Sequence, residues 1–474
     1  MKLKRIMLTS VLAAFLFTGC NEDDDEKLRE KALDVSSEQT SFNEADGTIS
    51  IKFSTGAAYD SDITIAYEVT GTAVSGDDFQ ALEGAITLPS GQTSVSQDLI
   101  LIDDTEVESS EDIVVTILSV AGVQDLIVGL QDEVILTITD NDSYPFENGI
   151  LVSHEGNFLQ GNASVSFVST DLSTVENSIF KSANNIDVLG DNVQSMAFHE
   201  DKGYVVVNGS QKVEVVNRYT FESVTTIGGP AESDFLNPRY MAIANGKGYV
   251  TNWGDGTNPD DDYVAVIDLE DNTVIAKIPV VEGPERILAK DNIIYVAQQG
   301  GYNQNNVISV IDATTNTVTT TVSVGDRPNS LQVDGNGDLW VLSGGNPSWT
   351  GNETAGQLDK ISTVDNAVLE TLSFAQTAHP SSLGVDGSNL YYYLTASVYK
   401  MEAAATTLPT MAEIMGLSFY DMAIIQGKLY GVDAKDYSSN GSLEVYDLND
   451  NALLGSKEVS IIPGEIYYNG TAER

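Results

Sequence analysis

Short stretches of alternating apolar and polar residues recur between residues 35 and 142 of this chain. They include TISIKFS (48–54), ITIAYEV (63–69), DIVVTILS (112–119) and EVILTITDND (133–142). A period of two, with turn residues between the stretches, is typical of β-strands that bury one face. The segment 35–142 therefore predicts an Ig-like β-sandwich of about seven strands.

Residues 143 to 149 (SYPFENG) separate this segment from a second pattern, which repeats about every 45 residues. Units begin at or near a Pro, at about residues 193, 238, 284, 328, 380, 418 and 463. Each unit has several short apolar stretches separated by turns such as Asn-Gly-Lys-Gly at 245–248. A repeat of this length predicts a β-propeller with one four-stranded blade per repeat.

The two ends of the repeat array complement each other. Its beginning, 150–191, contains three predicted strands, ILVSHEG, SVSFVSTD and VENSIF, and lacks the Pro-led first strand. The C-terminal PGEIYYNG (463–470) has that strand and almost nothing after it. We therefore expect an all-β chain in which the C-terminal strand completes a seven-bladed ring and removes its open sheet edges. A loose C-terminal strand is the alternative.

Charge and cysteine content limit the classes of partner and of covalent cross-link that the chain can have. The chain has 23 basic and 70 acidic residues, a net charge of −47, which argues against nucleic acid and anionic membrane surfaces as partners. Its single cysteine, Cys20, excludes an intrachain disulfide. Lys2, Lys4 and Arg5 precede an apolar run that is too short to span a bilayer stably.

The segment LFTGC (16–20) that follows resembles a bacterial lipoprotein signal. The resemblance implies removal of residues 1–19 and acylation of Cys20, and a plain signal peptide is the alternative. The next residues, NEDDDEK, resemble the surface-export signal of Bacteroidetes-type lipoproteins, although any acidic linker would look similar. Residues 20–34 would then be a tether, and the protein would be lipid-anchored in the outer membrane, facing the cell exterior.

Residues 35–142 also resemble a Calx-beta domain, through GTAVSGDDFQALEGAITLPSGQTS (71–94), DDTEVESSEDIVVTIL (103–118) and the closing ITDND (138–142). In that family, acidic residues at one end of the sandwich can bind Ca²⁺, a hard cation that takes several oxygen ligands. The resemblance implies as candidates Glu44, Asp78, Asp103, Asp104, Glu111, Asp140 and Asp142. A purely structural stalk without calcium is the alternative.

The repeat array resembles the YVTN-type propellers across 148–474, through the literal YVTN at 249–252 and strands such as VAVID at 264–268. In that strand order, the loops between the second and third strands share a face with the links between blades. These loops are long and variable, as binding loops on a rigid scaffold usually are. Their aromatic residues are Phe158, Trp253, Tyr302, Trp349 and Tyr437.

Amides accompany these aromatic residues, namely Asn157, Asn252, Gln298, Gln299, Asn303 and Asn346. Aromatic faces with amide donors and acceptors suit a large neutral or mixed-polarity ligand, such as a sugar or a macrocycle. Mutual packing of the aromatic residues is the alternative. The links between blades add Arg239, Arg286, Arg327 and His379. They could contact an anionic group of a ligand or pair with Glu285, Asp421 and Glu465.

The whole arrangement resembles the surface propeller lipoproteins of Bacteroidetes that capture ligands, cobalamin among them, for TonB-dependent transporters. This resemblance implies capture of an extracellular ligand, a corrinoid first and a glycan second. The first alternative is an adhesion protein with a calcium-stiffened stalk. The second is a lactonase-like hydrolase that uses Glu285, Asp421 and Glu465 with a divalent metal. The chain has three histidines and no nucleophile elbow, H-E-x-x-H or phosphate loop, so we expect no enzyme.

Overall fold

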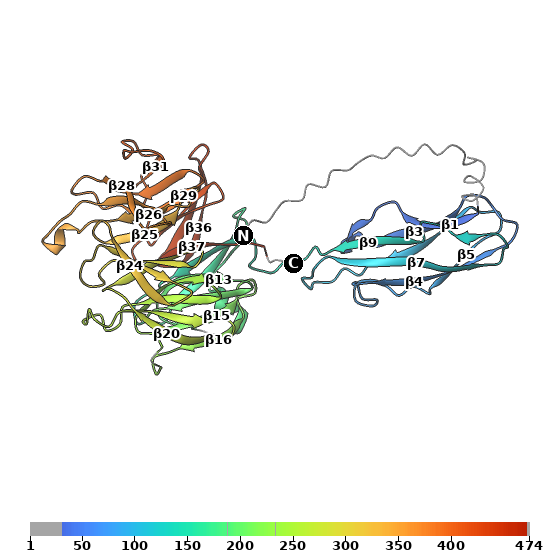
Figure 1. Ribbon diagram of the computed structural model, residues 1–474, viewed down its shortest axis with the longest axis horizontal. Coiled ribbons are helices and arrows are strands. Elements are labelled where there is room, and N and C mark those ends of the chain that lie inside the picture. Colours follow the sequence, from blue (N-terminus) through green and yellow to red (C-terminus); the bar gives the residue numbers. More distant parts are fainter. Residues whose placement is uncertain (1–30, 187, 233, 472–474) are drawn as a thin grey trace, which may run out of the picture. The chain divides into compact units, whose positions relative to one another are not determined.

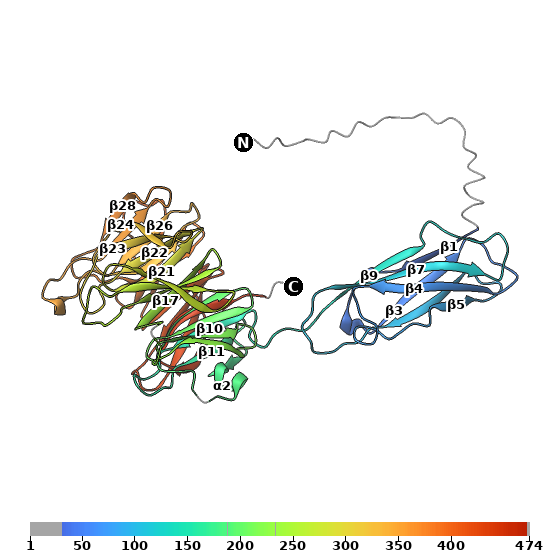
Figure 2. The same ribbon diagram turned by 60° about the horizontal axis from the view of Figure 1, so that its bottom comes forward.

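The computed structural model describes residues 31–471 except residues 187 and 233, and the chain divides into two units between Ser143 and Tyr144. Figures 1 and 2 show two views of the chain. The predicted signal peptide, the lipidation site Cys20 and residues 21–30 of the predicted tether lie outside the described residues. Within the described part of the chain, no helix has the length and apolarity needed to cross a bilayer.

The N-terminal unit contains two β-sheets. One has the order β6 (Ser94–Ile100), β3 (Thr48–Thr55), β1 (Ala32–Ser37) and β8 (Ile127–Val128). The other has the order β2 (Ser41–Asn43), β9 (Glu133–Thr139), β7 (Glu111–Ala121), β4 (Ile63–Gly71) and β5 (Ala85–Leu88). Alternate residues of these strands point into one shared apolar core, as Ile49, Ile51 and Phe53 of β3 do.

The prediction of about seven strands was therefore too low for this unit. The additional strands are the short β2 and β8, which pair in parallel with β9 and β1 at the sheet edges. Two or three residues are too few to show an alternating pattern, so periodicity could not reveal them. A 3₁₀-helix, η1 (Glu44–Asp46), follows β2, and the side chain of Asn43 caps it.

The C-terminal unit contains seven four-stranded antiparallel sheets among its described residues. Six of them are formed by consecutive strands. The first three contain β13 (Val193–His199), β14 (Lys202–Val207), β15 (Lys212–Asn217), β16 (Ser223–Gly228); β17 (Pro238–Ala244), β18 (Lys247–Asn252), β19 (Tyr263–Asp268), β20 (Thr273–Pro279); and β21 (Pro284–Lys290), β22 (Ile293–Gln298), β23 (Val307–Asp312), β24 (Thr317–Ser323). The next three contain β25 (Pro328–Val333), β26 (Leu339–Ser343), β27 (Gln357–Ile361), β28 (Val368–Ser373); β29 (Ser381–Asp386), β30 (Asn389–Tyr393), β31 (Ser397–Glu402), β32 (Ile414–Met415); and β33 (Asp421–Ile425), β34 (Lys428–Asp433), β35 (Asn440–Asp447), β36 (Leu453–Ile461).

The remaining sheet joins the two ends of this unit. It has the order β12 (Val175–Glu176), β11 (Ser164–Ser169), β10 (Gly149–His154) and β37 (Pro463–Asn469). The C-terminal strand β37 runs antiparallel to β10, with Gly149 opposite Asn469, and Figure 2 shows the red C-terminal strands beside β10. The stretch VENSIF, predicted as a full strand, forms only β12. Its last residues begin helix α2 (Ile179–Asn184), which buries Ile179 and Phe180.

Large aromatic side chains pack between neighbouring sheets of the C-terminal unit. They lie near the start of the second strand in six sheets and are at most 2 % exposed: Tyr204, Tyr249, Tyr295, Trp340, Tyr391 and Tyr430. The hydroxyl of Tyr249 also donates to the carbonyl of Ala313 at 3.0 Å, in the turn between the third and fourth strands of the next sheet. The repeated aromatic residue therefore fixes the spacing between sheets, which explains its recurrence in the sequence.

Candidate functional site

The long loops and the links between sheets lie on one face of the C-terminal unit, which we call the loop face. The Asn237 side chain, just before β17, donates to the Gly254 carbonyl in the β18–β19 loop at 2.9 Å. The Gly344 amide, after β26, donates to the Arg327 carbonyl, before β25, at 3.0 Å. The loops between second and third strands and the links between sheets are thus in contact, as the strand order predicts.

A polar cavity of about 250 Å³ opens within this unit. It is lined by Glu155, Gln194, Arg239, Tyr240, Glu285, Arg286, Gln299, Asn329, Ser381, Ser382, Tyr420, Asp421, Gly464 and Glu465. A second cavity of about 410 Å³ shares with it Tyr240, Arg286, Ser382, Asp421 and Glu465. The second cavity is lined by residues of β13, β17, β21, β25, β29, β33 and β37, the first strands of all seven sheets. One strand of each of the seven sheets therefore contributes to the lining of the second cavity.

Two of the three predicted arginines are held by acidic residues of the polar cavity. Arg239 donates from Nε and Nη2 to both carboxylate oxygens of Glu285, at 2.9 and 2.7 Å. Arg286 pairs with Asp421 at 3.2 Å and with Glu465 at 2.6 Å. Burial raises the pKa of Glu465, and the neighbouring Asp421 carboxylate adds to this rise against the attraction of Arg286. Ion pairing, one of the two alternatives that the sequence left open, thus occurs at Arg239 and Arg286.

The third arginine, Arg327, has different surroundings. It precedes β25, and its guanidinium lies 5.8 Å from the ring centroid of Trp349. Burial lowers the pKa of Arg327.

His379 also lies in a link between sheets, where Nδ1 is 2.8 Å from the Gly344 carbonyl and Nε2 is 3.3 Å from the Glu353 carboxylate.

The sequence did not single out several residues of the polar cavity. Tyr240 stacks under Arg286 at 4.3 Å and donates its hydroxyl to Glu465 at 3.2 Å. The Tyr420 hydroxyl donates to Glu155 at 3.0 Å, and burial raises the pKa of that carboxyl. Position in the repeat could have indicated Tyr240, which follows Arg239 in the Pro-led strand. Glu155 lies just beyond β10, where the sequence showed no charge pattern.

The predicted loop aromatics are largely presented to solvent. Phe158 and Tyr302 are each 73 % exposed, Trp349 is 71 % exposed and Tyr437 is 54 % exposed. Trp253 is the exception, because the guanidinium of Arg239 lies 4.3 Å above its ring and Tyr302 meets it edge-on. The predicted alternative of mutual packing thus occurs between Trp253 and Tyr302. Tyr302 and the three other aromatic side chains nevertheless remain more than half exposed.

The predicted amides divide into three groups. Asn252 and Gln298 are fully buried at the ends of β18 and β22, where they hydrogen-bond to Val250 and Ser309, so neither can meet a ligand at the surface. Gln299 lines the polar cavity. Three others serve loop structure and donate to the Tyr437 carbonyl, to Glu282 and to Asp326: Asn157, Asn303 and Asn346.

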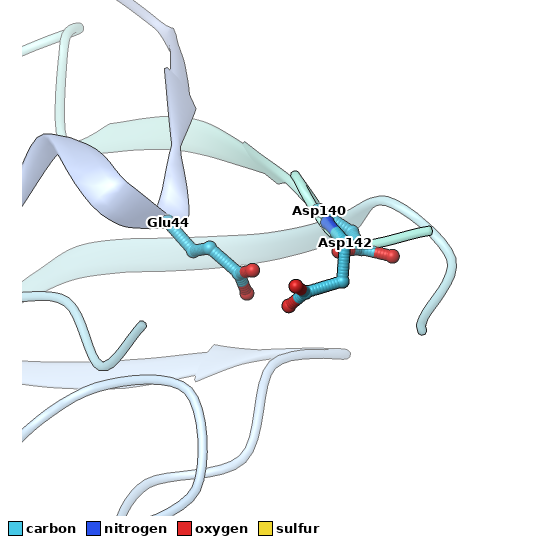
Figure 3. Close-up of side chains that lie close together, drawn as sticks. All are labelled: Glu44, Asp140 and Asp142. Atoms are coloured by element: carbon cyan, nitrogen blue, oxygen red, sulfur yellow. Dashed lines mark hydrogen bonds between the residues drawn. The ribbon is translucent and has the colours of Figure 1, made fainter. Parts of the chain in front are cut away.

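A group of carboxylates in the N-terminal unit has the spacing of a cation site. Glu44 in η1 and Asp140 and Asp142 after β9 each place an oxygen within 4.8 Å of the others. Figure 3 shows these side chains converging from two separate segments of the chain. Burial raises the pKa of Glu44 to about 7, and the charges of Asp140 and Asp142 add to this rise. An all-oxygen, mutually repelling set of donors fits a hard cation such as Ca²⁺.

A second acidic group combines Asp78, Glu108 and Glu111. Burial and Asp78 raise the pKa of Glu111 to about 7. Glu108 was not predicted as a ligand, although it lies in the stretch 103–118 that carries the Calx-beta resemblance. Asp103 and Asp104 belong to neither group among the described residues. Asp103 accepts a hydrogen bond from the Asn141 side chain at 3.2 Å, and Asp104 accepts one from the Glu106 amide at 2.7 Å.

Two family models match the chain. The Calx-beta domain matches residues 26–142, which confirms the predicted nature of the N-terminal unit. The family described as a domain of unknown function, DUF5074, matches residues 148–433. No protein of curated function matches the sequence.

Several solved structures resemble the chain at low sequence identity. A hypothetical selenium-binding protein from Sulfolobus tokodaii is 8 % identical with a TM-score of 0.52, covering 69 % of this chain and 95 % of that one. A functionally unknown protein from Desulfotomaculum acetoxidans is 14 % identical with a TM-score of 0.48, covering 69 % and 100 %. The apo form of the Calx CBD1 domain is 20 % identical with a TM-score of 0.21, covering 23 % and 99 %. Identities this low concern the fold alone.

Proposed function

The chain belongs to the DUF5074 family, and we propose that its C-terminal unit is a seven-bladed β-propeller that captures an extracellular ligand on the loop face. The seven sheets would be the blades, with β37 as the closing strand. Two findings support closure. First strands of all seven sheets line one cavity, and β37 lies against both β33 and β13.

The observation that carries the binding role is the combination of a polar cavity with accessible aromatic side chains on one face. Tyr302 and Trp349 project into solvent from loops that hydrogen bonds to Glu282 and Asp326 anchor to the links between sheets. Exposed aromatic residues that gather on one face indicate an interaction surface, whereas scattered single ones do not. Their positions around a polar, concave centre are those of a binding site on a rigid scaffold.

We propose a corrinoid as the first candidate ligand and a glycan as the second. The polar cavity, at about 250 Å³, is smaller than a site that encloses a drug-sized molecule. A macrocycle or an oligosaccharide would therefore lie across the loop face and contact the aromatic rings. Only a projecting polar group of it would enter the cavity.

The cellular setting of this proposal comes from the sequence resemblances. Acylation of Cys20 would anchor the protein in the outer membrane, and the acidic residues after it would direct it to the cell exterior. The Calx-beta domain would then hold the propeller away from the membrane. A TonB-dependent transporter would receive the captured ligand.

Isothermal titration calorimetry of cyanocobalamin and of a panel of oligosaccharides against the full chain tests this proposal. We expect one ligand class to bind with a 1:1 stoichiometry and Trp349→Ala to weaken it at least tenfold. The matched control is Val364→Ala, in the turn between β27 and β28 at the opposite end of the same sheet. Val364 is 94 % exposed, and its truncation should leave affinity unchanged. Absence of binding by any of these ligands to the folded protein would reject the proposal.

A calcium-stiffened stalk is a second proposed role, favoured by the acidic groups around Glu44 and Glu111. It is compatible with capture and also with an adhesion protein. We propose a binding protein over a lactonase-like enzyme, because Arg239 and Arg286 already neutralise the carboxylates that such an enzyme would use to hold a metal.

A further inference from the structure

We infer that Arg327 and Trp349 form a subsite for an oxyanion carried by the captured ligand. This inference rests on the proposed binding role of the loop face and names a chemical group that the ligand must carry. It starts from a difference among the four arginines that the structure describes. Those four are Arg218, Arg239, Arg286 and Arg327.

Three of these arginines have a hydrogen-bond acceptor within the protein. Arg218 donates to the side-chain oxygen of Asn469 at 2.6 Å, and Arg239 and Arg286 form the ion pairs of the polar cavity. The guanidinium of Arg327 makes no hydrogen bond or ion pair with any residue in the described part of the chain. Its nearest aromatic partner is the Trp349 ring. Burial without such a partner lowers the pKa of Arg327, which means that its charge is incompletely compensated.

The acidic residue next to Arg327 is engaged elsewhere. Asp326 accepts hydrogen bonds from the Asn346 side chain at 3.1 Å and from the Thr354 hydroxyl at 2.8 Å. Both donors belong to the loop that carries Trp349, so Asp326 holds this loop in place. The negative charge of Glu285 raises the pKa of Arg327, but Glu285 already accepts two hydrogen bonds from Arg239. In a chain with 70 acidic residues, the guanidinium of Arg327 is thus left for an external acceptor.

The backbone holds Arg327 in a fixed and unfavourable conformation. Its φ of 56° lies in the left-handed region, which costs free energy for a residue with a side chain. The amide of Arg327 donates to the Asn305 carbonyl at 2.8 Å, and its carbonyl accepts from Gly344 at 3.0 Å. Both partners lie in neighbouring loops of the loop face. The backbone from which the side chain extends is therefore held in place before any ligand arrives, which reduces the backbone entropy lost on binding.

The chemistry of the pair defines the ligand group. A guanidinium presents a planar fork of donors that matches a carboxylate, sulfate or phosphate. The exposed ring of Trp349 next to it offers an apolar face to the part of the ligand that bears this group. The net charge of −47 repels polyanions at long range, so the subsite favours a single oxyanion on an otherwise neutral body.

Arginine side-chain NMR of the full chain tests the subsite without requiring the natural ligand. Sodium sulfate, phosphate or acetate is added at constant ionic strength while the Nε–Hε signals are followed. The signal that is absent from the spectrum of Arg327→Gln should shift saturably. The signals of Arg239 and Arg286 should not, because these guanidinium groups are already paired with carboxylates of the protein. An equal drift of all signals, or no saturable shift of the Arg327 signal, would overturn the inference.

Matched ligands connect the subsite to capture. Cyanocobalamin carries a phosphodiester that cobinamide lacks, and sulfated oligosaccharides have neutral counterparts. One of these two ligand pairs is expected to bind the protein. Within that pair, Arg327→Gln should weaken binding of the oxyanion-bearing ligand at least tenfold and leave the affinity for the neutral ligand unchanged. Equal weakening of both members would overturn the inference. A saturable sulfate response without binding of either ligand class would keep the oxyanion subsite and reject the proposed ligands.

Discussion

In the N-terminal unit, Glu44 lies among the carboxylates of Asp140 and Asp142, whereas in the C-terminal unit Glu285 accepts two hydrogen bonds from Arg239. The first arrangement brings like charges together, and the second brings opposite charges together. Burial of like charges is unfavourable unless a cation or a proton compensates it. A buried ion pair carries its compensation within the chain. The N-terminal group is therefore suited to an external cation, and the central group of the C-terminal unit is complete without one.

The largest expected effect is the loss of stability when the C-terminal strand β37 is removed. Deleting residues 461–474 removes β37, whose Asn469 is fully buried and donates to the carbonyls of Phe146 and Arg218. The exposed edge of β10 and the opened cavity should cost most of the ~5–15 kcal/mol that stabilise a typical domain. Scanning calorimetry should show loss of the C-terminal transition and retention of the N-terminal one. A chain ending at Thr471 is the matched control. Retention of both transitions in the longer deletion would contradict ring closure by β37.

The internal pairing of charges in the C-terminal unit can be broken at Arg286. Replacing it by Met leaves the largely buried Glu465 and Asp421 carboxylates, whose side chains are 17 % and 13 % exposed, without their cation. We expect a loss of about 3–5 kcal/mol in the free energy of unfolding, measured with urea at neutral pH. The double variant Arg286→Met with Glu465→Gln should regain part of this loss because one buried charge is removed. No recovery would show that lost packing, and not charge, causes the effect.

Asp262 sharpens the comparison because it is a buried acid of the C-terminal unit whose charged neighbours are also acidic. Burial raises the pKa of Asp262 from 3.8 to about 7, and Asp261 and Glu282 add to this rise. The folded state therefore holds this proton more tightly than the unfolded state. The resulting stability is present below about pH 4 and is lost as the pH rises to about 7, by on the order of 4 kcal/mol. Asp262→Asn should flatten the C-terminal unit's stability profile over this interval, and an unchanged slope would contradict the assignment.

The smallest effect is expected for an exposed ion pair of the N-terminal unit. Lys31 and Asp125 lie 3.4 Å apart, with side chains 51 % and 76 % exposed. Solvent screens such a pair, so Asp125→Asn should change the free energy of unfolding by less than about 0.5 kcal/mol. A larger change in urea unfolding would show that surface charge also matters in this acidic chain.

Alternation of apolar and polar residues predicted the longer strands of the N-terminal unit, where burial alternates. The 45-residue repeat predicted the strands of the C-terminal unit, including the sheet that joins β37 to β10, β11 and β12. Side-chain direction was less predictable. Strand register shifts between Pro238 and Met241 and again between Pro284 and Ile287, so counting alternate positions could not show where Arg239 and Arg286 point. Polarity also did not separate the buried Asn252 from the exposed Asn303, since strand-end amides and loop amides look alike in sequence.

The most direct test of the contrast between the two units is scanning calorimetry of the full chain with Ca²⁺ and with chelator. Ca²⁺ should raise the N-terminal transition by several degrees, because it binds only the folded carboxylate group, and should leave the C-terminal transition in place. Glu44→Gln should reduce this shift, because the second acidic group around Glu111 remains, whereas Glu38→Gln, at an exposed position of the same unit, should retain it in full. Transitions that are both indifferent to Ca²⁺, or a shift of the C-terminal transition alone, would contradict the account.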